Sequence, residues 1–175
     1  MVAVLLIHDL GNVVKFDLES KDRKKVLVDE KDVEYWKMVQ KDTISKYGAG
    51  EHEATENMAK ELGIDKELQS LLGNMGRYEG ANMGLTREED FEVRICAYSD
   101  LRVAPYGVTS ALDRLDDLIY RYRGREKESV FRDMLDVTPK QERALFKNVS
   151  IKPEQITEES ISNYLAEFEN RKTYI

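Results

Sequence analysis

Two adjacent residues near the start of the chain, His8 and Asp9, are candidates for metal chemistry. They stand in the stretch "LLIHDLGNVV". An imidazole nitrogen and a carboxylate oxygen together suit borderline divalent cations such as Mn, Fe, Zn or Co. Gly11, which follows them, would let another chain segment or a phosphate approach closely. The dipeptide is also typical of a polar pair at a helix end that bonds to backbone, so both interpretations stay open.

The only other histidine, His52, stands at the beginning of "EHEATENMAKELG", which has the pattern of a helix. Glu51 and Glu53 flank it and would raise its basicity or supply oxygen ligands. The alternative is a solvated or capping histidine on an acidic surface.

Asp100 is the third candidate, because it lies near the end of a largely apolar helical segment, "RICAYSDLRVAPYG". A carboxylate in such surroundings is expected to be paired, hydrogen-bonded or bound to metal. Arg94, Arg102 and Arg114 are available as ordinary partners.

Arg114, Asp117 and Arg121 are separated by three and four residues, which places them on one helical stripe. This pattern predicts a salt-bridged helix surface, although an arginine there would also suit a phosphate. Cys96 lies within apolar helical sequence and is expected to be buried rather than nucleophilic. The sequence contains no P-loop, GxGxxG, CxxC or GxSxG pattern.

Composition excludes several classes of partner. The net charge of -7 disfavours broad contact with nucleic acid or with an anionic membrane surface. A single cysteine among 175 residues excludes an intrachain disulfide and fits a cytoplasmic location. The apolar start "VAVLLI" is too short to span a bilayer, and no basic residue precedes it as in a signal peptide.

The elements that must position these residues have the periodicity and end signals of helices. Residues 2–11 fit a buried helix or a strand. Pro139 is expected to open a helix, and Ile161, Leu165 and Phe168 are expected to face inward on the last one. Further helices are expected at 33–47, 51–62, 66–75, from a capping box at Thr86 and Glu89 to about 101, and at 110–122. Gly48 is expected to end the first of these, Asp65 to cap the helix at 66–75, and Ser110 or Thr109 to begin the last. The sequence therefore predicts an all-α fold, with residues 1–175 as a single domain.

Taken in order, three segments resemble the HD-domain superfamily of metal-dependent phosphohydrolases. "LLIHDLGN" is similar to the His-Asp signature of that family, and "EHEATENMAKELGI" is similar to its next helix. "ICAYSDLRVAPYGVTSALDRLDDLIYRY" is similar to a late segment whose aspartate is a metal ligand. The resemblance covers residues 2–123, and residues 124–175 would be a C-terminal helical extension.

The resemblance implies an HD-domain-like helical bundle that holds a divalent ion (Mn, Fe, Co, Zn or Mg). His8, Asp9 and Asp100 match metal ligands. His52 matches a position that serves a second metal or a substrate phosphate, and Arg102 would be a cation on the substrate side or a structural one.

The chain departs from the family pattern in its first metal-binding histidine, which belongs one helix upstream of the His-Asp pair. Only seven residues precede His8. We therefore expect either that an N-terminal helix has been lost, by truncation or a late start codon, or that the metal site is degenerate.

Two functions remain as hypotheses. The first is an HD-type phosphohydrolase acting on a nucleotide or another small phosphate ester, in which Asp9, His52 and Arg102 take part in catalysis. The second is a catalytically degenerate HD-like domain that binds a ligand or a protein. No nucleic acid or membrane partner is expected, and the sequence allows a homo-oligomer.

Overall fold

The computed structural model describes residues 1–19, 29–77, 91–125 and 127–172. They form two compact units, Met1–Arg77 and Tyr78–Ile175. The capping box at Thr86 and Glu89 lies outside the described residues. Each unit is described by itself below, and the single domain over residues 1–175 stays a prediction.

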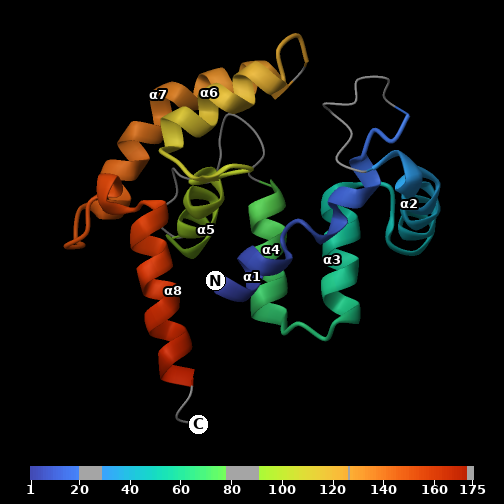
Figure 1. Cartoon of the computed structure of the whole chain (residues 1–175), viewed down its shortest axis with the longest axis horizontal. Helices are drawn as coiled ribbons and strands as arrows, with labels where there is room; N and C mark the ends of the chain where they lie inside the picture. The colour runs from blue at the N-terminus through green and yellow to red at the C-terminus, as the bar shows by residue number, and fades with distance from the viewer. Residues whose placement is uncertain (20–28, 78–90, 126, 173–175) are drawn as a thin grey trace. The chain divides into compact units, whose positions relative to one another are not determined.

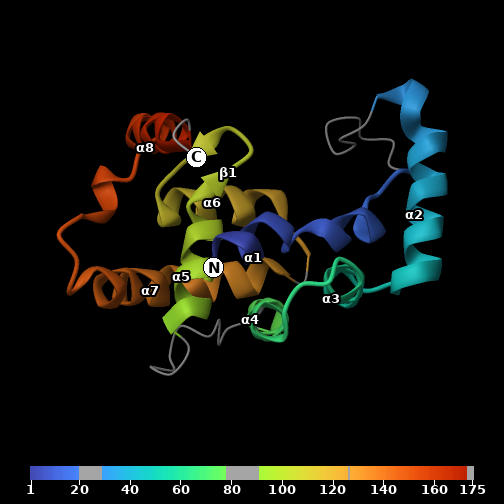
Figure 2. The same ribbon diagram turned by 90° about the horizontal axis from the view of Figure 1, so that it is seen from below.

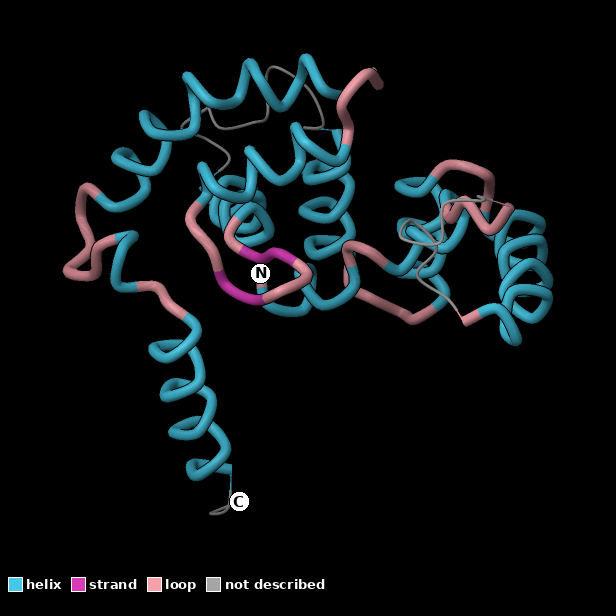
Figure 3. Tube along the Cα trace, turned by 45° about the horizontal axis from the view of Figure 1, so that its top comes forward, coloured by secondary structure: helices cyan, strands magenta, loops and turns pink. Residues whose placement is uncertain are grey.

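The fold is all-α, as the sequence predicts. Helices account for nearly all of the regular structure, and the two strands in the described residues are only two residues long (Figure 3). The first unit contains α1 (Val2–Ile7), α2 (Val33–Tyr47), α3 (Glu51–Glu61) and α4 (Lys66–Arg77). Two 3-10 helices, η1 (Leu10–Lys15) and η2 (Glu30–Asp32), complete it.

In the first unit, helices begin and end at residues that the sequence predicts as helix ends. Gly48 ends α2 with a φ of 107°, a conformation that favours glycine. The Asp65 carboxylate caps α4 by accepting a hydrogen bond from Leu68 N at 2.9 Å. As a result, α3 and α4 form a helical hairpin (Figure 1). Residues 2–7 form helix α1 and not a strand, and Val4 of this helix is fully buried.

The second unit contains α5 (Phe91–Leu101), the hairpin β1 (Val103–Ala104) and β2 (Gly107–Val108), and α6 (Ala111–Arg121). It continues with α7 (Lys127–Phe146), η4 (Pro153–Gln155) and α8 (Glu158–Lys172). Ser110 caps α6 by accepting a hydrogen bond from Asp113 N at 3.0 Å. α6 and α7 pack side by side over α5 (Figures 1 and 2). Their core includes Tyr98, Leu115 and Met134.

The prediction that Pro139 opens a helix is wrong, since α7 runs through it from Lys127 to Phe146. A proline inside a helix costs about 3 kcal/mol. The buried residues Met134, Thr138, Gln141 and Leu145 are spaced by four, three and four. This continuous buried stripe favours one long helix in spite of the proline.

The inward orientation predicted for the last helix is also wrong. Ile161 and Leu165 are both exposed on α8. The side chain of Phe168 lies outside the described residues. The periodicity identified an apolar stripe but could not identify what covers it.

A buried hydrogen-bond chain links α5 to α7. The Tyr98 hydroxyl donates to Glu142 Oε2 at 2.6 Å and accepts from Arg102 Nη1 at 2.7 Å. Burial, helped by the bond to Glu142, raises the pKa of Tyr98 to about 12. The chain therefore keeps Tyr98 in its neutral form.

We expect this shift to make stability fall at alkaline pH. An unfolded tyrosine ionises near pH 10, so the unfolded state loses its proton first. The stabilisation that comes from the raised pKa of Tyr98 is complete below about pH 10 and is lost as the pH rises through about 12. Its loss lowers the free energy of unfolding by roughly 2–3 kcal/mol. Urea unfolding across this range should show the loss in the parent protein and in Tyr120→Phe, whose ring is exposed, but not in Tyr98→Phe. Equal pH dependence in all three proteins would contradict it.

Candidate functional site

The His8–Asp9 pair lies at the carboxyl end of α1, just before η1. His8 Nδ1 donates to the backbone carbonyl of Leu5 at 2.7 Å. A carbonyl only accepts hydrogen bonds, so the proton of a neutral imidazole must sit on Nδ1. Nε2 then carries the lone pair.

Nε2 lies 3.5 Å from Asp9 Oδ2. In neutral His8 these are two acceptors side by side, an arrangement that attracts a cation, either a proton on Nε2 or a metal ion. The bond from Nδ1 to a backbone carbonyl is also the outer contact typical of metal-binding histidines. The His8 side chain is 21% exposed and that of Asp9 is 64% exposed, so the pair is accessible from solvent.

The segment after the pair is fixed by a close contact with α3. Gly11 N donates to Thr55 Oγ1 at 2.8 Å. The Thr55 hydroxyl in turn lies 2.8 Å from Glu51 O and 3.4 Å from His8 O. A Cβ at Gly11 would lie 2.1 Å from Glu51 O and 2.6 Å from Thr55 Oγ1. Gly11 is therefore required for the approach of a chain segment, the first turn of α3.

This contact brings the second predicted histidine into the same region of the unit. His52 lies in the first turn of α3, and its Nε2 is 3.6 Å from Glu51 Oε1. The other oxygen of Glu51 pairs with Lys15 Nζ at 2.8 Å. Glu51 therefore lies within ion-pairing reach of both His52 and Lys15.

α2 holds the same segment from the other side. Gln40 Nε2 donates to Val13 O and to Phe16 O, each at 2.9 Å. The Phe16 ring packs edge to face against Trp36. Sequence reasoning missed Gln40 and Thr55. Their signal was a polar residue on the apolar face of a helix, with Gln40 one turn after Trp36.

Asp100 belongs to the second unit, whereas His8 and Asp9 belong to the first, and each unit is described by itself. It lies on the exposed side of the last turn of α5. The buried face of that helix includes Val93, Cys96 and Leu101. The Asp100 side chain is therefore exposed to solvent and not enclosed by these apolar side chains.

Of the two roles expected for Arg102, a substrate-side cation or a structural one, its contacts fit the structural role. It is buried, and its Nε donates to Thr109 O. Nη1 donates to Pro153 O at 3.2 Å as well as to Tyr98, and Nη2 donates to Ile156 O at 2.9 Å. These bonds hold the segment before α8 against α5 and the β2 end of the hairpin, so the guanidinium is committed to protein carbonyls.

The stripe on α6 forms the predicted ion pairs. Asp117 accepts from Arg114 Nη1 at 2.7 Å. It also accepts from Arg121 through Nε and Nη2, each at 2.9 Å. Cys96 is fully buried, and desolvation raises the pKa of its thiol. The stripe on α6 and the buried Cys96 therefore have the structural roles expected of them.

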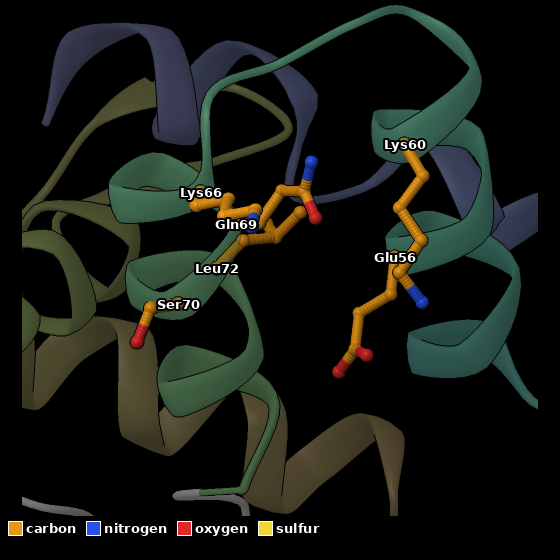
Figure 4. A pocket seen from close by; sticks show the side chains of 6 residues that line it. All are labelled: Glu56, Lys60, Lys66, Gln69, Ser70 and Leu72. Atoms are coloured by element: carbon orange, nitrogen blue, oxygen red, sulfur yellow. The ribbon is translucent and has the colours of Figure 1, made fainter.

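A separate cavity of about 320 Å³ lies between α3 and α4. Figure 4 shows Glu56 and Lys60 on α3 facing residues of α4 across it. Its lining residues are Glu56, Lys60, Lys66, Gln69, Ser70 and Leu72. None of the candidate residues lines this cavity.

Within the described residues, no group of three or more His, Cys, Asp or Glu side chains is arranged to hold a metal ion. No described helix is long and apolar enough to cross a bilayer. No family model, curated protein or solved structure matches this chain.

We expect Gly11→Ala to destabilise the protein by about 1–3 kcal/mol or more, because the new methyl group overlaps the backbone of α3. Gly50→Ala is the matched control, since its Cβ would meet only the Glu53 side chain, at ordinary distances of 3.6 Å and 3.8 Å. The control should cost less than about 1 kcal/mol. Urea unfolding measures both, and equal losses would show that Gly11 is not specially constrained.

We expect Arg102→Met to lower the free energy of unfolding by at least about 3 kcal/mol, because it leaves the buried Tyr98 hydroxyl and several partly buried carbonyls without a charged donor. Arg102→Lys keeps the charge but lacks the planar fork, so it should recover only part of the loss. Hydrogen exchange at 153–158 should accelerate in both variants. Unchanged hydrogen exchange at 153–158 would contradict the role of Arg102 in holding this segment.

Proposed function

We propose that this protein is a metal-dependent phosphohydrolase of the HD type that acts on a nucleotide or another small phosphate ester. The observation that supports this most directly is the His8–Asp9 pair. In this pair, His8 Nδ1 donates a hydrogen bond to Leu5 O, and His8 Nε2 lies 3.5 Å from Asp9 Oδ2.

The two side chains fit a divalent ion as two of its ligands, one nitrogen and one oxygen. A bound ion would polarise a phosphoryl oxygen and lower the pKa of a coordinated water.

The remaining roles follow from the surroundings of the pair. The Gly11–Thr55 contact holds the backbone around His8, which limits the freedom of the imidazole. His52, in the first turn of α3, would donate a hydrogen bond to the substrate, and its Nε2 lies 3.6 Å from Glu51 Oε1. Arg102 has no part in this scheme, because its guanidinium is enclosed.

The proposal predicts that one pair of residues carries both metal binding and turnover. We expect the purified protein to bind Mn²⁺, Co²⁺ or Zn²⁺ and to hydrolyse a generic aryl phosphate in the presence of one of these ions. His8→Ala and Asp9→Asn should weaken metal binding by at least about tenfold and abolish hydrolysis. Calorimetric titration with each metal, paired with the phosphatase assay, measures both effects.

Asp42→Asn is the matched control for Asp9→Asn, because Asp42 is an exposed aspartate on α2 of the same unit. It should bind metal and turn over substrate like the parent. Equal loss in this control, or metal binding that survives both site substitutions, would overturn the proposal.

A second candidate is a helical binding module without turnover. The enclosure of Arg102 favours it, since this predicted cation is committed to carbonyls rather than to a phosphate. Metal binding at His8 and Asp9 with no hydrolysis of any of a panel of phosphate esters would favour this candidate over the enzyme.

A further inference from the structure

The cavity between α3 and α4 lies wholly within the first unit and away from the His8–Asp9 pair. Its volume of about 320 Å³ is at the lower end of the range for small-molecule sites. Figure 4 shows the Glu56 side chain reaching from α3 towards α4 and the Gln69 side chain reaching from α4 towards α3. Side chains from both helices therefore converge on this space.

Glu56 supplies the negative charge of the cavity. Its side chain is half-buried, and it pairs with no other residue that the structure describes. Lys60, one turn later on α3, instead donates from Nζ to Asn57 Oδ1 at 3.2 Å. The Glu56 carboxylate lies against α4 at Gly73, where an added Cβ would be 3.1 Å from Glu56 Oε1. A glycine inside a helix lowers the stability of that helix, and here it leaves room for an acceptor that a cationic group can use.

Two lysines supply positive charge, Lys60 from α3 and Lys66 from the first turn of α4. Among the described residues, no carboxylate forms an ion pair with either ammonium group. An anionic group in the cavity would therefore meet two cations without displacing an existing ion pair. Such charge-assisted hydrogen bonds are the strong ones in ligand recognition.

The rest of the wall is uncharged. Leu72 is 4% exposed and gives the cavity an apolar surface. The Gln69 amide nitrogen already donates to Ile64 O at 2.6 Å, which fixes the position of that side chain. Because Glu56 and Lys66 belong to different helices, and packed helices lie about 8–10 Å apart, the opposite charges suit a ligand whose own charges are separated by a short apolar chain.

We propose that this cavity binds a small zwitterion, with an ammonium group and a carboxylate joined by a short alkyl chain. Glu56 binds the ammonium group, Lys60 and Lys66 bind the carboxylate, and Leu72 contacts the alkyl chain. A simple anion or a simple amine would leave one of these charged walls without a partner. Binding here is independent of the phosphohydrolase chemistry proposed for His8 and Asp9, so either proposal can fail without the other.

An NMR titration of the full chain with 6-aminohexanoate tests the proposal. The backbone amides of α3 and α4 should shift saturably, with a Kd of about 1 mM, as expected for a ligand of this size. Hexanoate and hexylamine each retain only one of the two charges, so each should bind at least about fivefold more weakly. No saturable shift in α3 and α4, or equal affinity for all three compounds, would overturn the proposal.

Two substitutions test which wall binds which charge. Glu56→Gln should weaken 6-aminohexanoate at least about fivefold without weakening hexanoate, and Lys66→Gln should weaken both of these compounds without weakening hexylamine. Glu67→Gln and Lys41→Gln are the matched controls, because both residues are exposed in the same unit and neither lines the cavity. Both controls should bind 6-aminohexanoate like the parent protein. Equal weakening in a variant and its control, or parent-like binding by Glu56→Gln, would overturn the proposal.

Discussion

The hydrogen bond from Gly11 N to Thr55 Oγ1 is the contact on which the first unit depends. It is possible only because residue 11 has no side chain, since a Cβ would enter the backbone of α3. The bond fixes η1 against the first turn of α3, while Gln40 holds the carbonyls of η1 from α2. The same threonine hydroxyl lies 3.4 Å from His8 O and 2.8 Å from Glu51 O, and Lys15 at the end of η1 pairs with the Glu51 carboxylate. The candidate site therefore depends on a buried polar contact rather than on an apolar core.

In the second unit, a buried cation, Arg102, holds separate segments of the chain together. Arg102 joins α5, the end of the hairpin and the segment that precedes α8 through carbonyl acceptors. Hydrogen bonds from a charged donor are stronger than neutral ones, and a buried acceptor that loses its donor is costly. Tyr98 extends this network to Glu142 on α7. The direction in which α8 leaves the unit follows from these bonds.

Local signals in the sequence predicted much of the fold. Gly48, Asp65 and Ser110 mark helix ends where the structure has them, because caps act within one turn. Pro139 misled the prediction, because packing along α7 outweighs the local preference of proline.

The candidate site was predictable only in part. The adjacency of His8 and Asp9 is visible in the sequence, but their relation to Glu51 and His52 arises from a contact between residues 44 apart, Gly11 and Thr55. Gly11 indicates in the sequence that another segment packs closely against it, but it does not identify that segment as α3. Likewise, the sequence offered Arg102 as a substrate-side or structural cation, and only its burial and carbonyl partners identify the structural role. Periodicity found the stripe on α8 but not its exposure.

The protonation of His8 is the most direct test of the central claim that His8 and Asp9 form a cation-binding pair. The chain has only two histidines, so a long-range proton–nitrogen correlation spectrum separates both imidazoles. At mildly alkaline pH we expect His8 to carry its proton on Nδ1, with a lone pair on Nε2. Titration with Zn²⁺ should then shift the Nε2 resonance of His8 in the parent protein and not in Asp9→Asn. A proton on Nε2 before metal is added, or an unchanged Nε2 resonance at saturating Zn²⁺, would contradict the claim.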